Sequence, residues 1–124
     1  MLNRVFLIGR CVADPELQFT NSGSPFTRFR IAVNRPYKDR KGNWQEEVLF
    51  IDVVVWGDAA DRAVTRLSKG SRVLVEGRLV QSSWETESGE KRNKIEVRAD
   101  RVVALDYRQE ESQEPEEIED DIEF

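Results

Sequence analysis

A single short helical segment interrupts a chain whose other apolar residues mostly alternate with polar ones. Between residues 58 and 67, Ala60, Ala63 and Leu67 recur at the three- and four-residue spacing of a helix that buries one face. Asp58 is a favourable N-cap, and Gly70 is a favourable C-terminal stop. The pattern predicts one helix of roughly three turns. The rest of the fold must therefore be built from strands.

The two-residue period of a strand is clearest in residues 47–56, where the odd-numbered positions from Leu49 to Val55 are all aliphatic. Asp14-Pro15 ends an earlier predicted strand, because proline has no N–H to donate to a sheet. Strands are expected over residues 3–12, 26–34, 47–56, 71–80 and from 95 to 103, with a short continuation at 17–20.

The predicted order is three strands, one helix and two strands. The strand count alone is also consistent with a β-sandwich or an SH3-like barrel. A helix between the third and fourth strands favours the OB-fold, which is a five-stranded Greek-key barrel. We therefore predict an all-β OB-fold domain over residues 1–108, with one short helix between strands 3 and 4, followed by a disordered acidic tail over residues 109–124.

Charge is distributed unevenly along the sequence. All 19 Lys and Arg lie in residues 1–108 together with 15 Asp and Glu, whereas the last sixteen residues contain nine acidic residues. A basic body with an acidic tail is typical of nucleic-acid-binding proteins whose tail contacts partners. The alternative is a tail that only solubilises the chain, since runs of like charge are usually just solvated.

Few residues could support catalysis or metal binding. The sequence has no histidine, and its one cysteine, Cys11, lies in an apolar run that predicts burial. Lys69-Gly70-Ser71 lacks the earlier glycine of a phosphate-binding loop. We therefore expect no enzyme activity, no cofactor and no metal site. With no signal-like or membrane-spanning stretch, a cytoplasmic location is expected.

Aromatic residues are the strongest candidates for a binding surface. Phe50 and Trp56 lie an even number of residues apart, so both point away from the aliphatic face of the 47–56 strand. Tyr37 and Trp44 fall in residues 35–46, predicted to be a basic loop, and Trp84 falls on a polar hairpin. Exposed rings can stack on any base. The alternative for Trp44 and Trp84 is packing across the barrel mouth or at a subunit contact.

Cationic side chains near these rings are the candidate phosphate contacts, because they lie in predicted loops or at the ends of predicted elements. Neutralising phosphates releases counterions, so the affinity that results falls as salt rises. The candidates are Lys38, Arg40, Lys41, Lys69, Lys91, Arg92 and Lys94.

Several separated blocks of the sequence resemble the bacterial single-stranded-DNA-binding proteins, and they occur in the family's order. The resemblance covers about residues 3–105 and the extreme C-terminus. It implies an OB-fold, assembled as a homotetramer and associated with the nucleoid, that protects single-stranded DNA during replication, recombination and repair, with stacking rings at Tyr37, Phe50, Trp56 and Trp84. The blocks are Asn3-Arg4-Val5, Leu7-Ile8-Gly9-Arg10, Asp14-Pro15-Glu16, residues 50–57, residues 67–73, Val75-Glu76-Gly77 and Trp84.

Within its folded part, the sequence departs from the family pattern at positions that affect charge. Asp52 and Asp58 occupy positions that are often basic in the family. Ser82 and Ser83 precede the hairpin tryptophan, where the family often has basic residues. The path of a DNA backbone over this chain is therefore not fixed by the resemblance.

The acidic tail also differs from the family's, because it has almost no linker and Glu123 stands where a proline precedes the final phenylalanine. The resemblance implies that the tip docks replication and repair proteins. The residues expected to carry that docking are Asp120, Asp121, Ile122 and Phe124.

Two other functions fit the same predicted fold. An OB-fold can act as a protein-interaction module, such as a primosome-type accessory factor, in which exposed aromatics anchor a partner. It can also bind single-stranded RNA, which this sequence does not distinguish from DNA. The predicted function is sequence-tolerant binding of single-stranded DNA by base stacking and phosphate contacts, with partners recruited through the tail.

Overall fold

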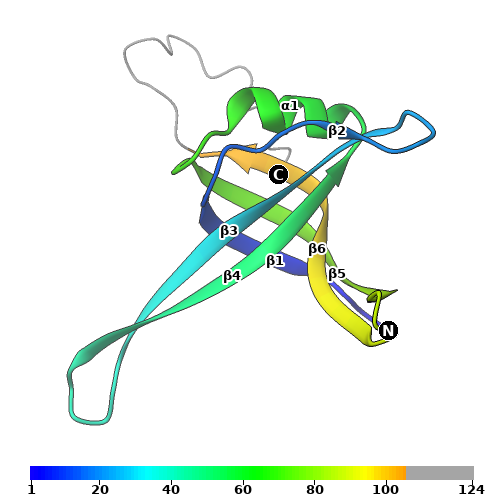
Figure 1. The fold of residues 1–124 in the computed structure, drawn as a ribbon. Coiled ribbons are helices and arrows are strands. Elements are labelled where there is room, and N and C mark those ends of the chain that lie inside the picture. The colour runs from blue at the N-terminus through cyan, green and yellow to red at the C-terminus, as the bar shows by residue number, and fades with distance from the viewer. Residues whose placement is uncertain (106–124) are drawn as a thin grey trace, which may run out of the picture.

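In the computed structural model, which describes residues 1–105, the helix follows four strands and precedes two more (Figure 1). The second strand has only two residues, so the helix lies between the third and fourth long strands, as predicted. The predicted tail over residues 109–124 lies outside the described residues. The elements are β1 (Val5–Cys11), β2 (Gln18–Phe19), β3 (Pro25–Lys38), β4 (Trp44–Trp56), α1 (Asp58–Arg66), β5 (Arg72–Glu85) and β6 (Lys91–Ala104).

Strand β1 closes the barrel, because it pairs with two other strands. It runs antiparallel to β5 over residues 5–10, and its end pairs with β3 through Arg10–Ala32 and Cys11–Ile31. The sheet order β1-β5-β6-β4-β3 therefore returns to β1, and β4 and β6 are its parallel neighbours. A five-stranded Greek-key barrel with one helix is the OB-fold, so the predicted fold class is confirmed.

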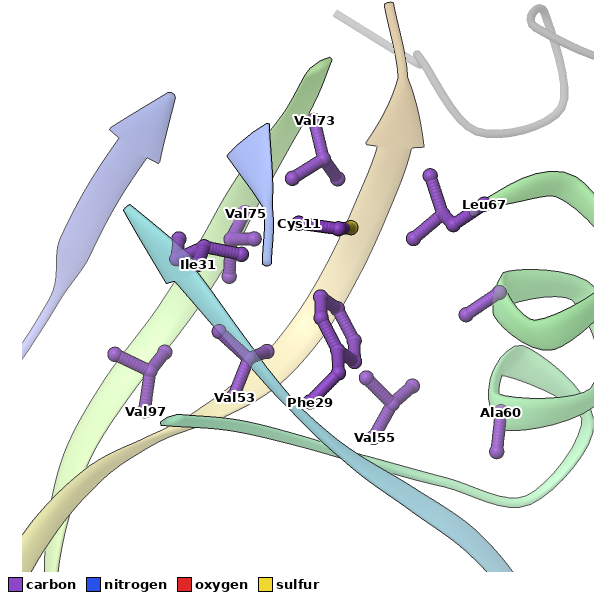
Figure 2. Close-up of a cluster of buried hydrophobic side chains, with 11 residues drawn as sticks. Cys11, Phe29, Ile31, Val53, Val55, Ala60, Leu67, Val73, Val75 and Val97 are labelled. Carbon is purple, nitrogen blue, oxygen red and sulfur yellow. The ribbon is translucent and has the colours of Figure 1, made fainter. Parts of the chain in front are cut away.

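The barrel interior is filled mainly by β-branched side chains from the barrel strands (Figure 2). Ile31, Val53, Val75 and Val97 have no exposed surface, which agrees with the alternation predicted for residues 47–56. Cys11 is 3% exposed, as its apolar setting predicted. Burial raises the pKa of its thiol to about 11, so this cysteine acts as a small apolar core residue.

Helix α1 covers one end of the barrel (Figure 1). It contributes Ala60 and Ala63 to the core, and Leu67 joins them just beyond its last turn. Small alanine side chains let the helix backbone approach the strands closely. Within residues 1–105, the structure has no helix long and apolar enough to cross a membrane.

The ends of α1 differ from the predicted ones. Gly57 is the N-cap, with φ at 69°, and no side chain caps the helix. The turn out of β4 needs this left-handed conformation, which glycine adopts readily and Asp58 does not. Asp58 is instead the first residue of the helix, where its negative charge interacts favourably with the positive end of the helix dipole. The helix ends at Arg66, because the chain is already extended at Leu67, before Gly70 is reached.

Beyond the barrel, β3 and β4 continue as a two-stranded hairpin over residues 34–48, the β3–β4 arm. Its pairing runs from Asn34–Val48 to Lys38–Trp44, so the basic loop predicted for residues 35–46 is wrong except at its turn. Pro36 suggested a loop, but a proline fits a two-stranded ribbon where its nitrogen faces away from the partner strand. Leu49, predicted to point into the barrel, lies at the base of this arm and is 47% exposed.

A second hairpin, the β5–β6 arm, spans residues 81–95 and extends the pairing of β5 with β6. Figure 1 shows both arms leaving the barrel on the side away from α1 and diverging from each other. The two arms therefore enlarge one side of the molecule without adding to its core.

Strands β5 and β6 approach closely at Gly77, where the register shifts at a β-bulge. A Cβ atom at this position would overlap the carbonyl oxygen of Arg98 and lie 2.9 Å from the Cα of Ala99. Both are backbone atoms, so the clash cannot be relieved by turning a side chain.

We expect Gly77→Ala to lower the free energy of unfolding by about 3 kcal/mol or more, because the strands must separate to admit a methyl group. Gly23→Ala is the matched control. Gly23 has a φ of 91° and nothing near its added Cβ, so that change costs only about 1–2 kcal/mol of backbone strain. Urea denaturation would measure both, and equal losses would contradict the close-packing argument.

Candidate nucleic-acid interface

The face of β4 that points away from the core carries Phe50, Asp52, Val54 and Trp56 at alternate positions. Phe50 is 56% exposed and Trp56 is 38% exposed, whereas the inward-facing Val53 is fully buried. Both rings therefore point outward, as strand parity predicted. Their contact with bases remains a prediction.

Trp56 is part of a larger aromatic platform. The β3–β4 register places Phe26 opposite Trp56, and the two rings stack with centroids 5.0 Å apart and an interplanar angle of 30°. The guanidinium of Arg98 lies 5.6 Å from the centroid of the Trp56 ring, and that of Arg28 lies 6.0 Å from the Phe26 ring. Sequence reasoning missed Phe26, Arg28 and Arg98, because parity alone does not give cross-strand neighbours.

The β3–β4 arm carries two further predicted rings, each next to a cation. Trp44 is 67% exposed, and the Lys38 ammonium lies 5.3 Å from its centroid. Tyr37 is 38% exposed, and the Arg35 guanidinium lies 5.7 Å from its centroid. Because Trp44 is paired with Lys38, the neighbour of Tyr37, the two rings lie on opposite faces of the arm.

The turn of this arm holds the predicted cations Arg40 and Lys41 at its tip. Asp39 organises the turn by accepting hydrogen bonds of 2.9 Å from the backbone N–H groups of Asn43 and Lys41. These bonds, that of Asn43 foremost, lower the pKa of Asp39. The tip is thus a defined turn with exposed cations beside the rings of the arm.

Trp84 lies on the outer face of the β5–β6 arm and is 48% exposed. Arg92 is directly opposite it and shares its face, whereas Lys91 is opposite Glu85 and points to the other face of the arm. Arg92 also pairs with Glu90 at 3.0 Å. Trp84 and Trp44 are exposed on separate arms, so the two rings do not pack across the barrel mouth.

Two predicted phosphate contacts have a different setting from the expected one. Lys69 lies in the turn between α1 and β5, where its backbone N–H donates to Asp14 at 2.7 Å. This turn is at the opposite end of β5 from Trp84, so Lys69 does not flank the arm aromatics. Lys94 lies within a paired strand and is engaged by carboxylates of the same face.

An ion-pair network occupies the centre of this face, between Phe50 and Trp56. Asp52 accepts from Arg30 Nε at 2.9 Å and from the Lys94 ammonium. Glu96 accepts from Arg28 Nε at 3.0 Å and Nη2 at 3.3 Å, and its Oε2 lies 3.8 Å from Lys94 Nζ. Asp52 is 8% exposed and Glu96 4% exposed, so both carboxylates lie beneath the cations.

The charge state of Asp52 follows from this network. Burial alone raises the pKa of its carboxyl, but the hydrogen bonds and charges of Lys94 and Arg30 outweigh burial and lower it. Asp52 is therefore ionised at neutral pH. From the sequence, Asp52 stood out only as a departure from the family pattern. Its ion pair with Arg30 could not be predicted, because it depends on the strand register that places Arg30 opposite Asp52.

The remaining predictions concern residues beyond this face. The docking residues Asp120, Asp121, Ile122 and Phe124 lie outside the part of the chain that the structure describes. Among residues 1–105, no group of three or more His, Cys, Asp or Glu is arranged to hold a metal ion. The candidate interface consists of the outer face of β3, β4 and β6 together with the two arms.

Comparison with known proteins gives a consistent result. A family model described as the single-strand binding protein family matches residues 2–105. The "Single-stranded DNA-binding protein" of Aquifex aeolicus is 43% identical over 129 residues, which cover 99% of this chain and 87% of the relative. The protein of the same description from Corynebacterium glutamicum is 48% identical over 100 residues, covering 79% of this chain and 44% of that relative.

A solved structure described as "Plasmodium falciparum SSB complex with ssDNA" is similar over 86% of this chain and 97% of its own. The TM-score is 0.79 and the sequence identity is 27%. The similarity therefore extends across the described barrel and not only over short motifs.

Proposed function

This chain belongs to the single-strand binding protein family, and we propose that it binds single-stranded DNA without catalysing a reaction on it. The observation that carries the proposal is the series of exposed rings on β4 and on the two arms, where Trp44 and Trp56 each have a cation over the ring and Trp84 has Arg92 opposite it. Binding of this kind would protect single strands during replication, recombination and repair.

In the proposed mode of binding, bases stack on the exposed rings while cations contact phosphates. The Phe26–Trp56 pair and Phe50 provide platforms on the barrel, and Trp44 and Trp84 provide platforms on the arms. Every base has a π-face, so such platforms tolerate any sequence. The proposed phosphate contacts are Lys38, Arg40, Lys41, Lys91 and Arg92.

Tyr37 has a different proposed role from Trp44, because it lies on the reverse face of the arm. A single strand that contacts both rings has to pass around the arm. The Arg35 guanidinium beside Tyr37 is also paired with Glu47 at 3.3 Å, so this reverse face offers fewer cations for phosphates than the tip does.

Loss of a stacking ring tests the proposal directly. We expect Trp56→Ala and Trp84→Ala each to weaken binding of an oligo-dT strand by about 1–3 kcal/mol, which is roughly 5- to 150-fold. Anisotropy of a labelled oligonucleotide measures this without depending on tryptophan emission. Trp56→Phe is the matched control, because it keeps a ring and should retain most of the affinity.

Undiminished affinity in both alanine variants would contradict base stacking at these positions. If the wild-type chain itself fails to bind labelled DNA at low salt, the proposed function is wrong. A length-matched RNA oligomer as competitor distinguishes a DNA-binding from an RNA-binding OB-fold.

We propose that residues 109–124 form a separate acidic unit that docks replication and repair proteins through Asp120, Asp121, Ile122 and Phe124. Nine negative charges within sixteen residues suit a basic docking groove on a partner. Glu123 adds a charge next to Phe124 and so changes the docking segment relative to the family pattern.

Removal of residues 109–124 should leave the affinity for single-stranded DNA unchanged or raise it at low salt, because the acidic segment competes with DNA for cations. Parallel titrations of the full and shortened chains, at low and high salt, measure the effect. A shortened chain that no longer binds DNA would show that the division between barrel and tail is wrong.

We further propose that the chain assembles as a homotetramer. The outer face of β1 supports self-association, because Phe6 is 65% exposed and Ile8 is 53% exposed at neighbouring outward positions. Adjacent exposed apolar side chains of this size commonly mark an interaction surface.

Sedimentation equilibrium should give four times the chain mass of 14.4 kDa. The double variant Phe6→Asp with Ile8→Asp should lower that mass, because a carboxylate cannot be buried unpaired in an apolar contact. A wild-type chain that sediments as a monomer at micromolar concentration would refute the assembly.

A further inference from the structure

We infer that Asp52 and Glu96 are positioning residues that hold Arg28, Arg30 and Lys94 in the binding face and cancel part of their charge. Under this inference, single-stranded DNA gains more of its affinity from stacking than from phosphate attraction on this face. The inference rests on the proposed function, because it concerns how the same surface binds DNA.

The network has two layers. The two carboxylates are almost fully buried, whereas the side chains of Arg28, Arg30 and Lys94 retain 43%, 51% and 35% of their exposure. The acidic groups therefore lie below and the cations lie above, within reach of a ligand. DNA approaching this face meets the cations first and does not contact the carboxylates directly.

The carboxylates cancel most of the positive charge of the network. Three cations and two carboxylates leave a net charge of +1 on the network, in place of the +3 that the cations alone would carry. Each carboxylate lies within a few ångströms of its cations, so a phosphate further away experiences mainly the sum. Fewer counterions are then released from DNA than the number of cations suggests.

Glu96 also orients one of the cations. Glu96 engages two nitrogens of Arg28, which fixes the plane of that guanidinium. Because two of its nitrogens already donate to Glu96, Arg28 presents chiefly the flat face of its guanidinium to a ligand. Guanidinium planes can stack on bases. The network lies between the Phe50 and Trp56 rings, so it continues the stacking surface between them.

The experiment compares wild type with Asp52→Asn and Glu96→Gln. Affinity for oligo-dT is measured by fluorescence anisotropy across a salt series. Each substitution frees a cation for phosphate contact, so binding should tighten at low salt, and the log-log salt slope should steepen by about 0.7 per carboxylate removed. Glu16→Gln is the matched control, since it removes one negative charge from an exposed position between β1 and β2.

A purely structural role would give a different result, in which both variants lose thermal stability and affinity while the salt slope stays unchanged. The cations are substantially exposed, so they stay solvated when one carboxylate is removed. Either variant alone can therefore test the inference if the other fails to fold. Variants that bind with wild-type affinity and with the wild-type salt slope would overturn the inference. Failure of wild type to bind would instead overturn the proposed function.

A second measurement addresses the cations themselves. Arg30→Gln should make the wild-type salt slope shallower by about 0.7, because the net charge of the network falls from +1 to 0. In the Asp52→Asn background, the same substitution should return the slope to its wild-type value, because the net charge returns from +2 to +1. A double variant whose slope stays as steep as that of Asp52→Asn would contradict the cancellation of Arg30 by Asp52.

Discussion

Closure of the barrel by β1 is the constraint on which the rest of the structure depends. A Cβ atom on Gly9 would lie 2.6 Å from the carbonyl oxygen of Ala32, so glycine lets β1 and β3 approach. Once the sheet is closed, each barrel strand has one face toward a filled interior and one face toward solvent. Aliphatic side chains and Phe29 fill the interior, and Phe50 and Trp56 lie at outward-facing positions of β4.

Sequence reasoning succeeded where a property depends on one strand or on the order of elements. The position of the helix identified the fold, and the two-residue period of residues 47–56 determined which rings point outward. It failed where a property depends on pairing between strands. Parity places Arg30 on the outer face but cannot put it opposite Asp52. The β3–β4 arm was missed for a related reason. Pro36 argues against a strand, because only the pairing shows that a proline can lie at the free edge of a two-stranded hairpin.

Charge shows the same dependence on arrangement at two scales. The net charge of −5 conceals a basic body and an acidic tail. Within the body, the count of cations on the outer face overstates what a phosphate would meet, because Asp52 and Glu96 lie directly beneath three of them. A surface of this composition favours contacts of short range, such as stacking, over long-range attraction.

The two arms give the molecule an uneven distribution of stability. From Asn34 to Phe50 almost every side chain is exposed, and a two-stranded ribbon that buries so little apolar surface is only marginally stable by itself. We therefore expect hydrogen exchange at the amides of the arm to be faster than in the barrel. If a ligand holds these hairpins in place, their ordering would offset part of the free energy of binding.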